Sequence, residues 1–152
     1  MKKLILFLMT LTLSSTFASP GDGCFKTYIE RGYTISSASE ACKGRVSDDC
    51  FNAFVSGGYT LTSASNACKG DVGDECFRTY LEKGYALSSA SEACKGRVSD
   101  LCFATYLMRG RSLSSASNDC KGGVGDIGNE CFKTYIERGY TLSSASAACK
   151  NY

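Results

Sequence analysis

Ten cysteines are the residues of this 152-residue chain whose spacing points most clearly to a chemistry. Structural zinc sites favour short ligand spacings and often include histidine, and thiol redox catalysis commonly uses Cys-x-x-Cys. The chain contains neither a histidine nor a Cys-x-x-Cys, so we expect no metal and no cofactor. An even number of cysteines instead favours disulfides in an oxidising compartment. The ten are Cys24, Cys42, Cys50, Cys68, Cys76, Cys94, Cys102, Cys120, Cys131 and Cys149.

The spacing of the cysteines suggests which of them pair. Cys24 and Cys42 lie 18 residues apart and are placed symmetrically about Tyr33. In an antiparallel hairpin with equal arms they face each other, at the roughly 5.5–6 Å Cα separation that a disulfide needs. The alternative pairs Cys42 with Cys50 and leaves Cys24 and Cys149 unpaired at the two ends. We predict the first scheme.

Other catalytic chemistries find little support. Without histidine, Ser-His and Cys-His nucleophile pairs are excluded. Two acidic pairs, Asp48-Asp49 and Asp74-Glu75, are formally able to act as general acid and base. Acidic residues in the first turn of a helix, however, complement its dipole and need no catalytic role. We therefore predict that the protein is not an enzyme, with a carboxylate-dependent enzyme as the remaining alternative.

Three further sets of residues recur at regular intervals along the chain, and we call each set a column. Each column has a structural and a functional interpretation. The lysines at Lys43 and its equivalents either complement helix C-termini or form a cationic stripe for an anionic polymer. The serine pairs, such as Ser36-Ser37, either cap helices or present hydroxyls to ice or glycans. Tyr33 and its equivalents either pack at helix ends or offer aromatic platforms to sugars or peptides. In each case we favour the structural interpretation.

All these columns belong to one tandem repeat of 26 residues, lengthened to 29 before the last copy. After a cap such as Ser47, apolar residues recur at helical spacing as far as Val55. A first helix is expected to end at Gly58 and a second, Leu-Ser-Ser-Ala-Ser-x-Ala-Cys-Lys, at Gly70. The sequence thus predicts an all-α fold, a short α-solenoid of five disulfide-stapled helical hairpins. The repeats span 24–49, 50–75, 76–101, 102–130 and 131–152.

Two expectations concern how the repeats pack. Stacking should bury Phe25 and its equivalents between neighbours, as in other repeat arrays. Glu40 and Arg45 change together with their equivalents between odd and even repeats, which suggests an ion pair within each odd repeat. The same alternation implies an underlying unit of two repeats.

The N-terminus predicts export. Two lysines, an apolar run from Leu4 to Leu13 and small residues at Thr16 and Ala18 form a signal peptide over residues 1–18, cleaved near Ala18. This leaves 19–152 as one repeat domain, secreted or periplasmic. Without Lys2 and Lys3 that domain has 15 basic and 15 acidic residues. A neutral balance and the lack of a second apolar segment argue against nucleic-acid binding and membrane insertion.

Function is predicted from the residues that local structure leaves free. At the end of each first helix one pair of positions varies freely and is expected to be exposed; we call these residues the rim. We expect a non-enzymatic interaction scaffold that binds a protein, peptide or surface polymer there. The alternative is a passive structural or envelope-protective protein without a specific ligand. The rim residues are Glu30, Arg31, Glu82, Lys83, Met108, Arg109, Glu137 and Arg138.

Overall fold

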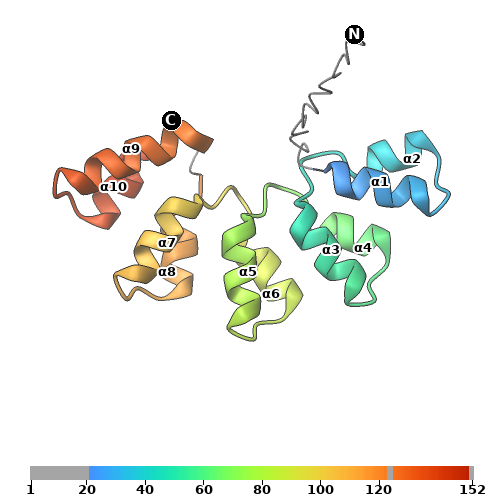
Figure 1. Ribbon diagram of the computed structural model, residues 1–152, viewed down its shortest axis with the longest axis horizontal. Helices are drawn as coiled ribbons and strands as arrows, with labels where there is room; N and C mark the ends of the chain where they lie inside the picture. The colour runs from blue at the N-terminus through green and yellow to red at the C-terminus, as the bar shows by residue number, and fades with distance from the viewer. Residues whose placement is uncertain (1–20, 123–124, 151–152) are drawn as a thin grey trace, which may run out of the picture.

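The protein is an arc of five helical hairpins in the computed structural model, which describes residues 21–122 and 125–150 (Figure 1). The predicted all-α repeat architecture is confirmed. The described residues form ten helices: α1 (Asp22–Glu30), α2 (Ile35–Ala41), α3 (Asp48–Ser56), α4 (Leu61–Ala67), α5 (Asp74–Glu82), α6 (Leu87–Cys94), α7 (Asp100–Met108), α8 (Leu113–Asp119), α9 (Gly125–Glu137) and α10 (Leu142–Cys149). The predicted signal peptide lies outside the described residues.

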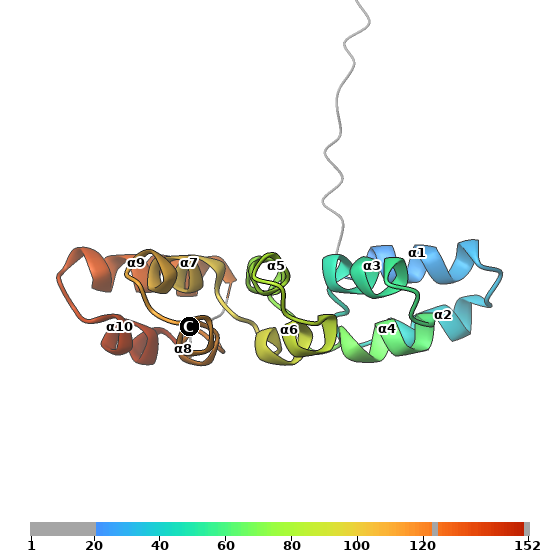
Figure 2. The same ribbon diagram turned by 90° about the horizontal axis from the view of Figure 1, so that it is seen from below.

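The helices form two layers. Figure 2 shows the odd-numbered helices in one layer and the even-numbered helices in the other. Within each hairpin the two helices run side by side, and their turn points to the convex side of the arc (Figure 1). We call this side the outer edge. The loops that join successive hairpins gather on the concave side, which we call the inner edge. They include residues 43–47, 69–73 and 95–99.

Each hairpin is closed by the predicted disulfide. The pairs are Cys24–Cys42, Cys50–Cys68, Cys76–Cys94, Cys102–Cys120 and Cys131–Cys149, and none of the cysteines is free. Their Cα atoms lie 5.6–5.8 Å apart, within the range that an unstrained bridge requires. Because the first cysteine lies near the start of an odd helix and the second at the end of an even one, each bridge closes its hairpin at the inner edge. Five such bridges indicate an oxidising, extracytoplasmic environment.

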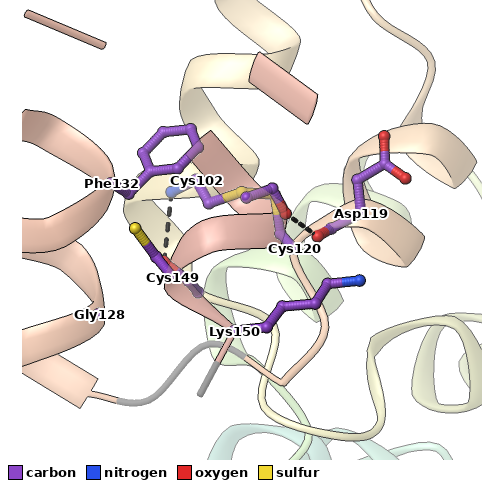
Figure 3. Close-up of a pocket in the computed structure, with 9 residues that line it drawn as sticks. Cys102, Asp119, Cys120, Gly128, Phe132, Cys149 and Lys150 are labelled. Atoms are coloured by element: carbon purple, nitrogen blue, oxygen red, sulfur yellow. Dashed lines mark hydrogen bonds between the residues drawn. A yellow bond between two sulfur atoms is a disulfide. The ribbon is translucent and has the colours of Figure 1, made fainter. Parts of the chain in front are cut away.

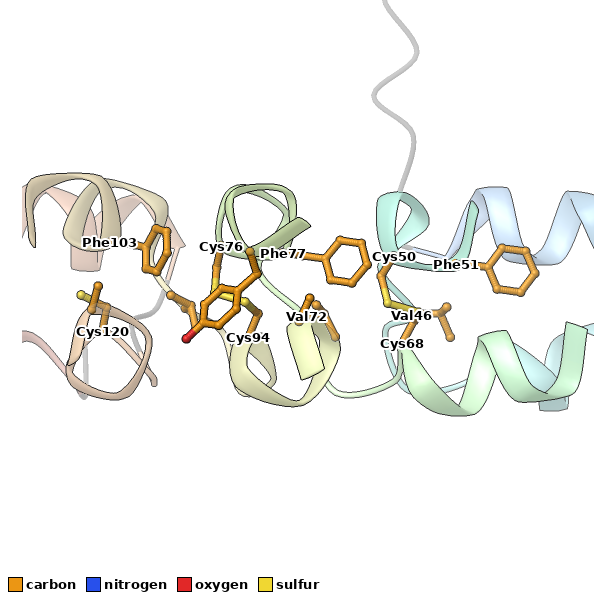
Figure 4. Packing of buried hydrophobic residues seen from close by; sticks show 14 of the residues in the cluster. Val46, Cys50, Phe51, Cys68, Val72, Cys76, Phe77, Cys94, Phe103 and Cys120 are labelled. Carbon is orange, nitrogen blue, oxygen red and sulfur yellow. A yellow bond between two sulfur atoms is a disulfide. The ribbon is translucent and has the colours of Figure 1, made fainter. Parts of the chain in front are cut away.

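The core lies between successive hairpins. The phenylalanine after the first cysteine points to the preceding hairpin, as Figure 4 shows for Phe51 and Phe77. Phe51 stacks on Tyr28 with 6.4 Å between ring centroids. Both phenylalanines are at most 2% exposed, as are Phe103 and Phe132, so their predicted burial is confirmed. The prediction is wrong for Phe25, which is 37% exposed because none of the described residues stacks in front of the first hairpin.

A ladder of backbone hydrogen bonds connects the loops of the inner edge. The N–H of Gly70 donates to the carbonyl of Gly44, Gly96 donates to Gly70, and Gly122 donates to Gly96, over 3.2, 3.0 and 2.9 Å. Each donor lies one full repeat after its acceptor. These glycines have φ of +79° to +94°, which only glycine adopts without strain. The ladder therefore fixes the register in which one repeat stacks on the next.

The end of the second helix differs from the prediction. α2 stops at Ala41 with Cys42 as its C-cap, two residues before Gly44. Its start, which the sequence left open, is capped by Thr34, whose hydroxyl accepts a hydrogen bond from the Ser37 N–H. Among the described residues no helix is both long and apolar enough to cross a membrane.

Candidate binding surface on the outer edge

The outer edge is shaped by the way the odd helices end. At the first hairpin the Gly32 N–H donates to the Ile29 carbonyl and the Tyr33 N–H donates to the Tyr28 carbonyl. The helix thus ends at the glycine, as predicted, and it does so in a Schellman motif with Gly32 at a φ of +83°. It turns the Tyr33 ring back against Tyr28, with 5.1 Å between centroids. The ending repeats in every hairpin, so a left-handed glycine and its following side chain mark each turn.

The aromatic column after these glycines is half-exposed. Tyr33, Tyr59 and Tyr85 are 49–50% exposed, and Tyr140 is 52% exposed. Each packs one side against the ring at the end of its own helix, at about 5.0 Å between centroids, and leaves the other side to solvent. In the fourth hairpin Arg111 replaces the tyrosine and is exposed. The column therefore combines the packing and platform interpretations: its rings are held in place and still accessible.

The rim residues lie beside these turns, and all eight are exposed. Glu30 ends α1, and Arg31 is its C-cap, a position that Lys83 and Arg109 hold in α5 and α7. Successive hairpins keep them apart, so they form a row along the edge and not one cluster. Met108 is the most exposed of the large apolar side chains, at 78%.

One member of this variable column is constrained by packing, contrary to the expectation that structure leaves the column free. At Gly57, which corresponds to Arg31, an added Cβ would lie 3.0 Å from Cδ1 of Leu87. Leu87 begins α6 in the following hairpin. The glycine therefore makes room for a neighbouring side chain, and the second hairpin contributes no charge to the rim.

An open groove of about 450 Å³ lies between the first two turns. Arg31 and Tyr33 line it from the first hairpin, and Tyr59 and Leu61 from the second. Sequence reasoning singled out Arg31 and the tyrosine column but did not place them together. Thr60 and Leu61, which also line the groove, are ordinary helix-start residues, so nothing in the sequence marks them as part of a surface site.

The first acid of each pair at the inner edge accepts hydrogen bonds near the start of a helix. Oδ1 of Asp48 accepts hydrogen bonds from the N–H groups of Gly23 and Cys24, at 3.0 and 3.3 Å, at the start of α1. Oδ1 of Asp74 accepts from the Ser47 hydroxyl at 2.6 Å. Each acid thus reaches the preceding hairpin, a link that the sequence did not reveal.

Burial raises the pKa of the Asp74 carboxyl, while the Ser47 hydroxyl opposes the shift and the charges of Asp49 and Asp48 add to it. Burial likewise raises the pKa of Asp100, with Asp74 as the next contribution. These carboxyls are therefore crowded helix-end groups that take up a proton at a higher pH than an ordinary aspartate does.

The predicted ion pair between Glu40 and Arg45 is wrong. Arg45 reaches Asp71 of the next repeat at 3.3 Å, and Arg97 reaches the same carboxylate from the other side at 2.8 Å. Glu40 instead lies 3.6 Å from Lys43. The helix ends earlier than expected, so Glu40 never faces Arg45. Asp71 of the second repeat thus bridges the arginines of the first and the third.

The junction between the fourth and fifth hairpins contains a small cavity (Figure 3). Its volume is about 20 Å³, enough for one water molecule and too small for a substrate. Cys102, Cys120 and Phe132 are among the residues that line it. Across the same junction Ser146 donates a hydrogen bond to the Asp119 carbonyl (Figure 3).

Over residues 21–122 and 125–150, no group of three or more acidic or cysteine side chains is arranged to hold a metal ion. Comparisons of the chain with protein-family models, with curated proteins and with solved structures found no match.

Proposed function

We propose that the protein is an exported, non-enzymatic scaffold that binds a protein or peptide along its outer edge. The observation that carries this proposal is the groove between the first two turns, where Arg31 lies with Tyr33 and Tyr59. Its volume of about 450 Å³ is within the range of ligand-sized sites. Tyrosine and arginine are the side chains that contribute most to binding at protein interfaces.

The tyrosines suit this role because they are already ordered. Tyr33 and Tyr59 are each packed edge-on against a buried ring, at 5.1 and 5.0 Å. A partner that covers the exposed face of such a ring immobilises little further, so less of its contact energy is offset by lost side-chain entropy. Because similar turns recur along the arc, an elongated partner can contact several of them.

The charges along the edge favour a protein or peptide over an anionic polymer. Glu30 lies beside Arg31, and Glu137 beside Arg138, so acid and base alternate. The whole chain carries a formal net charge of only +2. A polyanion binds to a continuous positive field, whereas a chain of mixed charge matches alternating signs.

The remaining features support export and a non-catalytic role. Five disulfides call for an oxidising compartment, and with the signal peptide we infer a secreted or periplasmic protein cleaved near Ala18. Asp48 and Asp74, the best candidates for carboxylate catalysis, accept hydrogen bonds at helix starts. These hydrogen bonds explain their positions without a reaction.

The test is selection of a phage-displayed random peptide library on the immobilised mature chain. We expect enriched peptides that share a motif and bind saturably. In the variant Arg31→Glu/Tyr33→Ser/Tyr59→Ser their dissociation constants should rise at least about tenfold. The matched control is Lys43→Glu, an equal charge reversal on the exposed inner edge, which should leave binding unchanged.

Circular dichroism of each variant is the control that checks whether the fold is retained. If no peptide is enriched, or if the triple variant binds as well as the original chain, the outer edge is not a peptide-binding surface. Enrichment of acidic sequences alone, lost with Lys43→Glu, would point to an anionic-polymer site at the inner edge instead.

A further inference from the structure

The two ends of the array carry complementary faces that the interior repeats bury against one another. On the first hairpin, four columns are more exposed than in the repeats that follow. Phe25 is 37% exposed whereas Phe51 and its equivalents are at most 2% exposed, and Ile35 is 72% exposed whereas Leu61 is 8% exposed. Ile29 and Ser39 are also exposed, whereas their counterparts are half-buried or buried. These side chains mark the face on which a preceding repeat stacks.

The opposite half of the same contact is uncovered in the fifth hairpin. Tyr28 receives the Phe51 ring, and with Phe54, Tyr80 and Tyr106 it is at most 5% exposed. Tyr135, their counterpart in α9, is only half-buried, because no following ring among the described residues covers it. At one end of the array Phe25 thus has no tyrosine to stack on, and at the other end Tyr135 has no phenylalanine to cover it.

We propose that the first hairpin of one molecule stacks on the fifth hairpin of another, so that copies associate head to tail and extend the solenoid. The contact repeats the internal interface. Phe25 covers Tyr135 as Phe51 covers Tyr28, and the Tyr135 hydroxyl meets Ser39. Tyr28 and Ser65 make this hydrogen bond at 3.4 Å within the chain, as do Tyr80 and Ser117 at 3.2 Å.

A second copy is favoured over an unrelated partner because the match already exists within the molecule. Four internal junctions bury this phenylalanine, so both faces have the shape and polarity of a working interface. In other repeat arrays the terminal repeats carry a polar outer face that prevents such stacking. Here Phe25, Ile29 and Ile35 take that place, and they leave an apolar face uncovered.

The geometry also sets the form of the assembly. The two faces differ, so the contact is heterologous and each added copy leaves both an open head and an open tail. Each junction consists of two short helices per side, which is small compared with a stable dimer interface. The association is therefore reversible and depends on concentration, and it yields chains of varying length in place of one defined oligomer.

The experiment is sedimentation velocity of the exported, disulfide-bonded protein between about 1 µM and about 1 mM. We expect the weight-average mass to rise continuously with concentration. Phe25→Lys should raise the apparent dissociation constant at least about tenfold. The matched control is Leu101→Lys, the same kind of change at an apolar side chain that is also 37% exposed but lies in the fourth hairpin, away from both end faces. This variant should associate like the original protein.

Mixing two end-blocked variants tests the heterologous contact directly. Phe25→Lys keeps an open tail and Tyr135→Lys keeps an open head, so each alone should be monomeric and the mixture should form dimers and no longer species. Urea unfolding confirms that both variants are folded. If Tyr135→Lys is unfolded, Phe25→Lys mixed with the original protein replaces it, and it should shorten the chains. A monomer at every concentration, or association that Phe25→Lys leaves unchanged, overturns the proposal.

Discussion

Removal of one central disulfide tests how the hairpins are held together. In the variant Cys76→Ala/Cys94→Ala the third hairpin loses its bridge while the rest of the sequence is unchanged. The bridge closes a separation of 18 residues, for which the chain-entropy relation gives about 3 kcal/mol at 25 °C. Both cysteines are fully buried in the original structure, so a small packing loss adds to this value.

The same change in the first hairpin, Cys24→Ala/Cys42→Ala, separates the two contributions. Its loop has the same separation of 18 residues, so the entropic loss is equal. The first hairpin, however, packs against one described neighbour, and the third packs against two. In nearest-neighbour repeat arrays, weakening a central unit also uncouples the units on either side. We therefore expect the central variant to lose more stability and to unfold in two stages.

The assay is urea unfolding followed by far-ultraviolet circular dichroism under non-reducing conditions. The original chain should unfold in one transition, the terminal variant should lose about 3 kcal/mol, and the central variant should show a broadened or divided transition. An unfolding free energy within about 0.5 kcal/mol of the original for both variants would refute the reasoning. In that case the stacking, and not the bridge, would hold each hairpin closed.

Three other predictions follow from the packing and the charges. Phe77→Ala should cost about 4 kcal/mol and Phe25→Ala about 2.5 kcal/mol at micromolar concentration, because about a third of the Phe25 side chain is exposed; urea unfolding of the two variants measures the difference, and equal losses would contradict it. Asp71→Asn should cost less than about 1 kcal/mol, because Arg45 and Arg97 are partly exposed, and the loss should vanish in high salt; a loss that persists at 1 M salt would mean that the loop, and not the charge, is affected. Asp74→Asn should gain stability relative to the original chain as the pH rises from 3 to 7. Burial raises the pKa of Asp74 above its ordinary 3.8, so protonation of this carboxyl stabilises the folded state of the original chain. That stabilisation is present below pH 3.8 and is lost as the carboxyl ionises. Asparagine keeps the oxygen that accepts from Ser47, as Asn129 does from Ser99, and thermal unfolding at both pH values checks the sign; a gain that is independent of pH would contradict it.

The features that the sequence predicted correctly are those decided within one repeat. The disulfide pairing follows from equal arms about Tyr33, and the helix end at Gly32 follows from the need for a left-handed residue. Both depend on residues of a single hairpin, with the two cysteines 18 positions apart. The same holds for the capping of α3 by Ser47, whose hydroxyl accepts from the Cys50 N–H.

The features that the sequence missed are contacts between repeats. Glu40 and Arg45 looked like partners because they are close in the chain, yet Arg45 reaches Asp71, 26 residues away. The groove at Tyr33 and Tyr59 exists only because two turns meet. Burial of Phe25 was expected because the repeats look alike, although the first copy has one neighbour fewer. In a tandem array the same residue types recur in every copy, so the sequence does not tell which copy a given side chain contacts.

The position of the disulfides at the inner edge also determines how the molecule responds to a pulling force. The bridge between Cys24 and Cys42 shields the whole hairpin between them from tension, because the load passes through the sulfur atoms. Only the connecting segment, such as the eight residues from Cys42 to Cys50, is free to extend. A junction with such an eight-residue segment therefore lengthens by at most about 3 nm when it gives way. The hairpins themselves remain closed, and the chain behaves as five rigid links joined by short tethers.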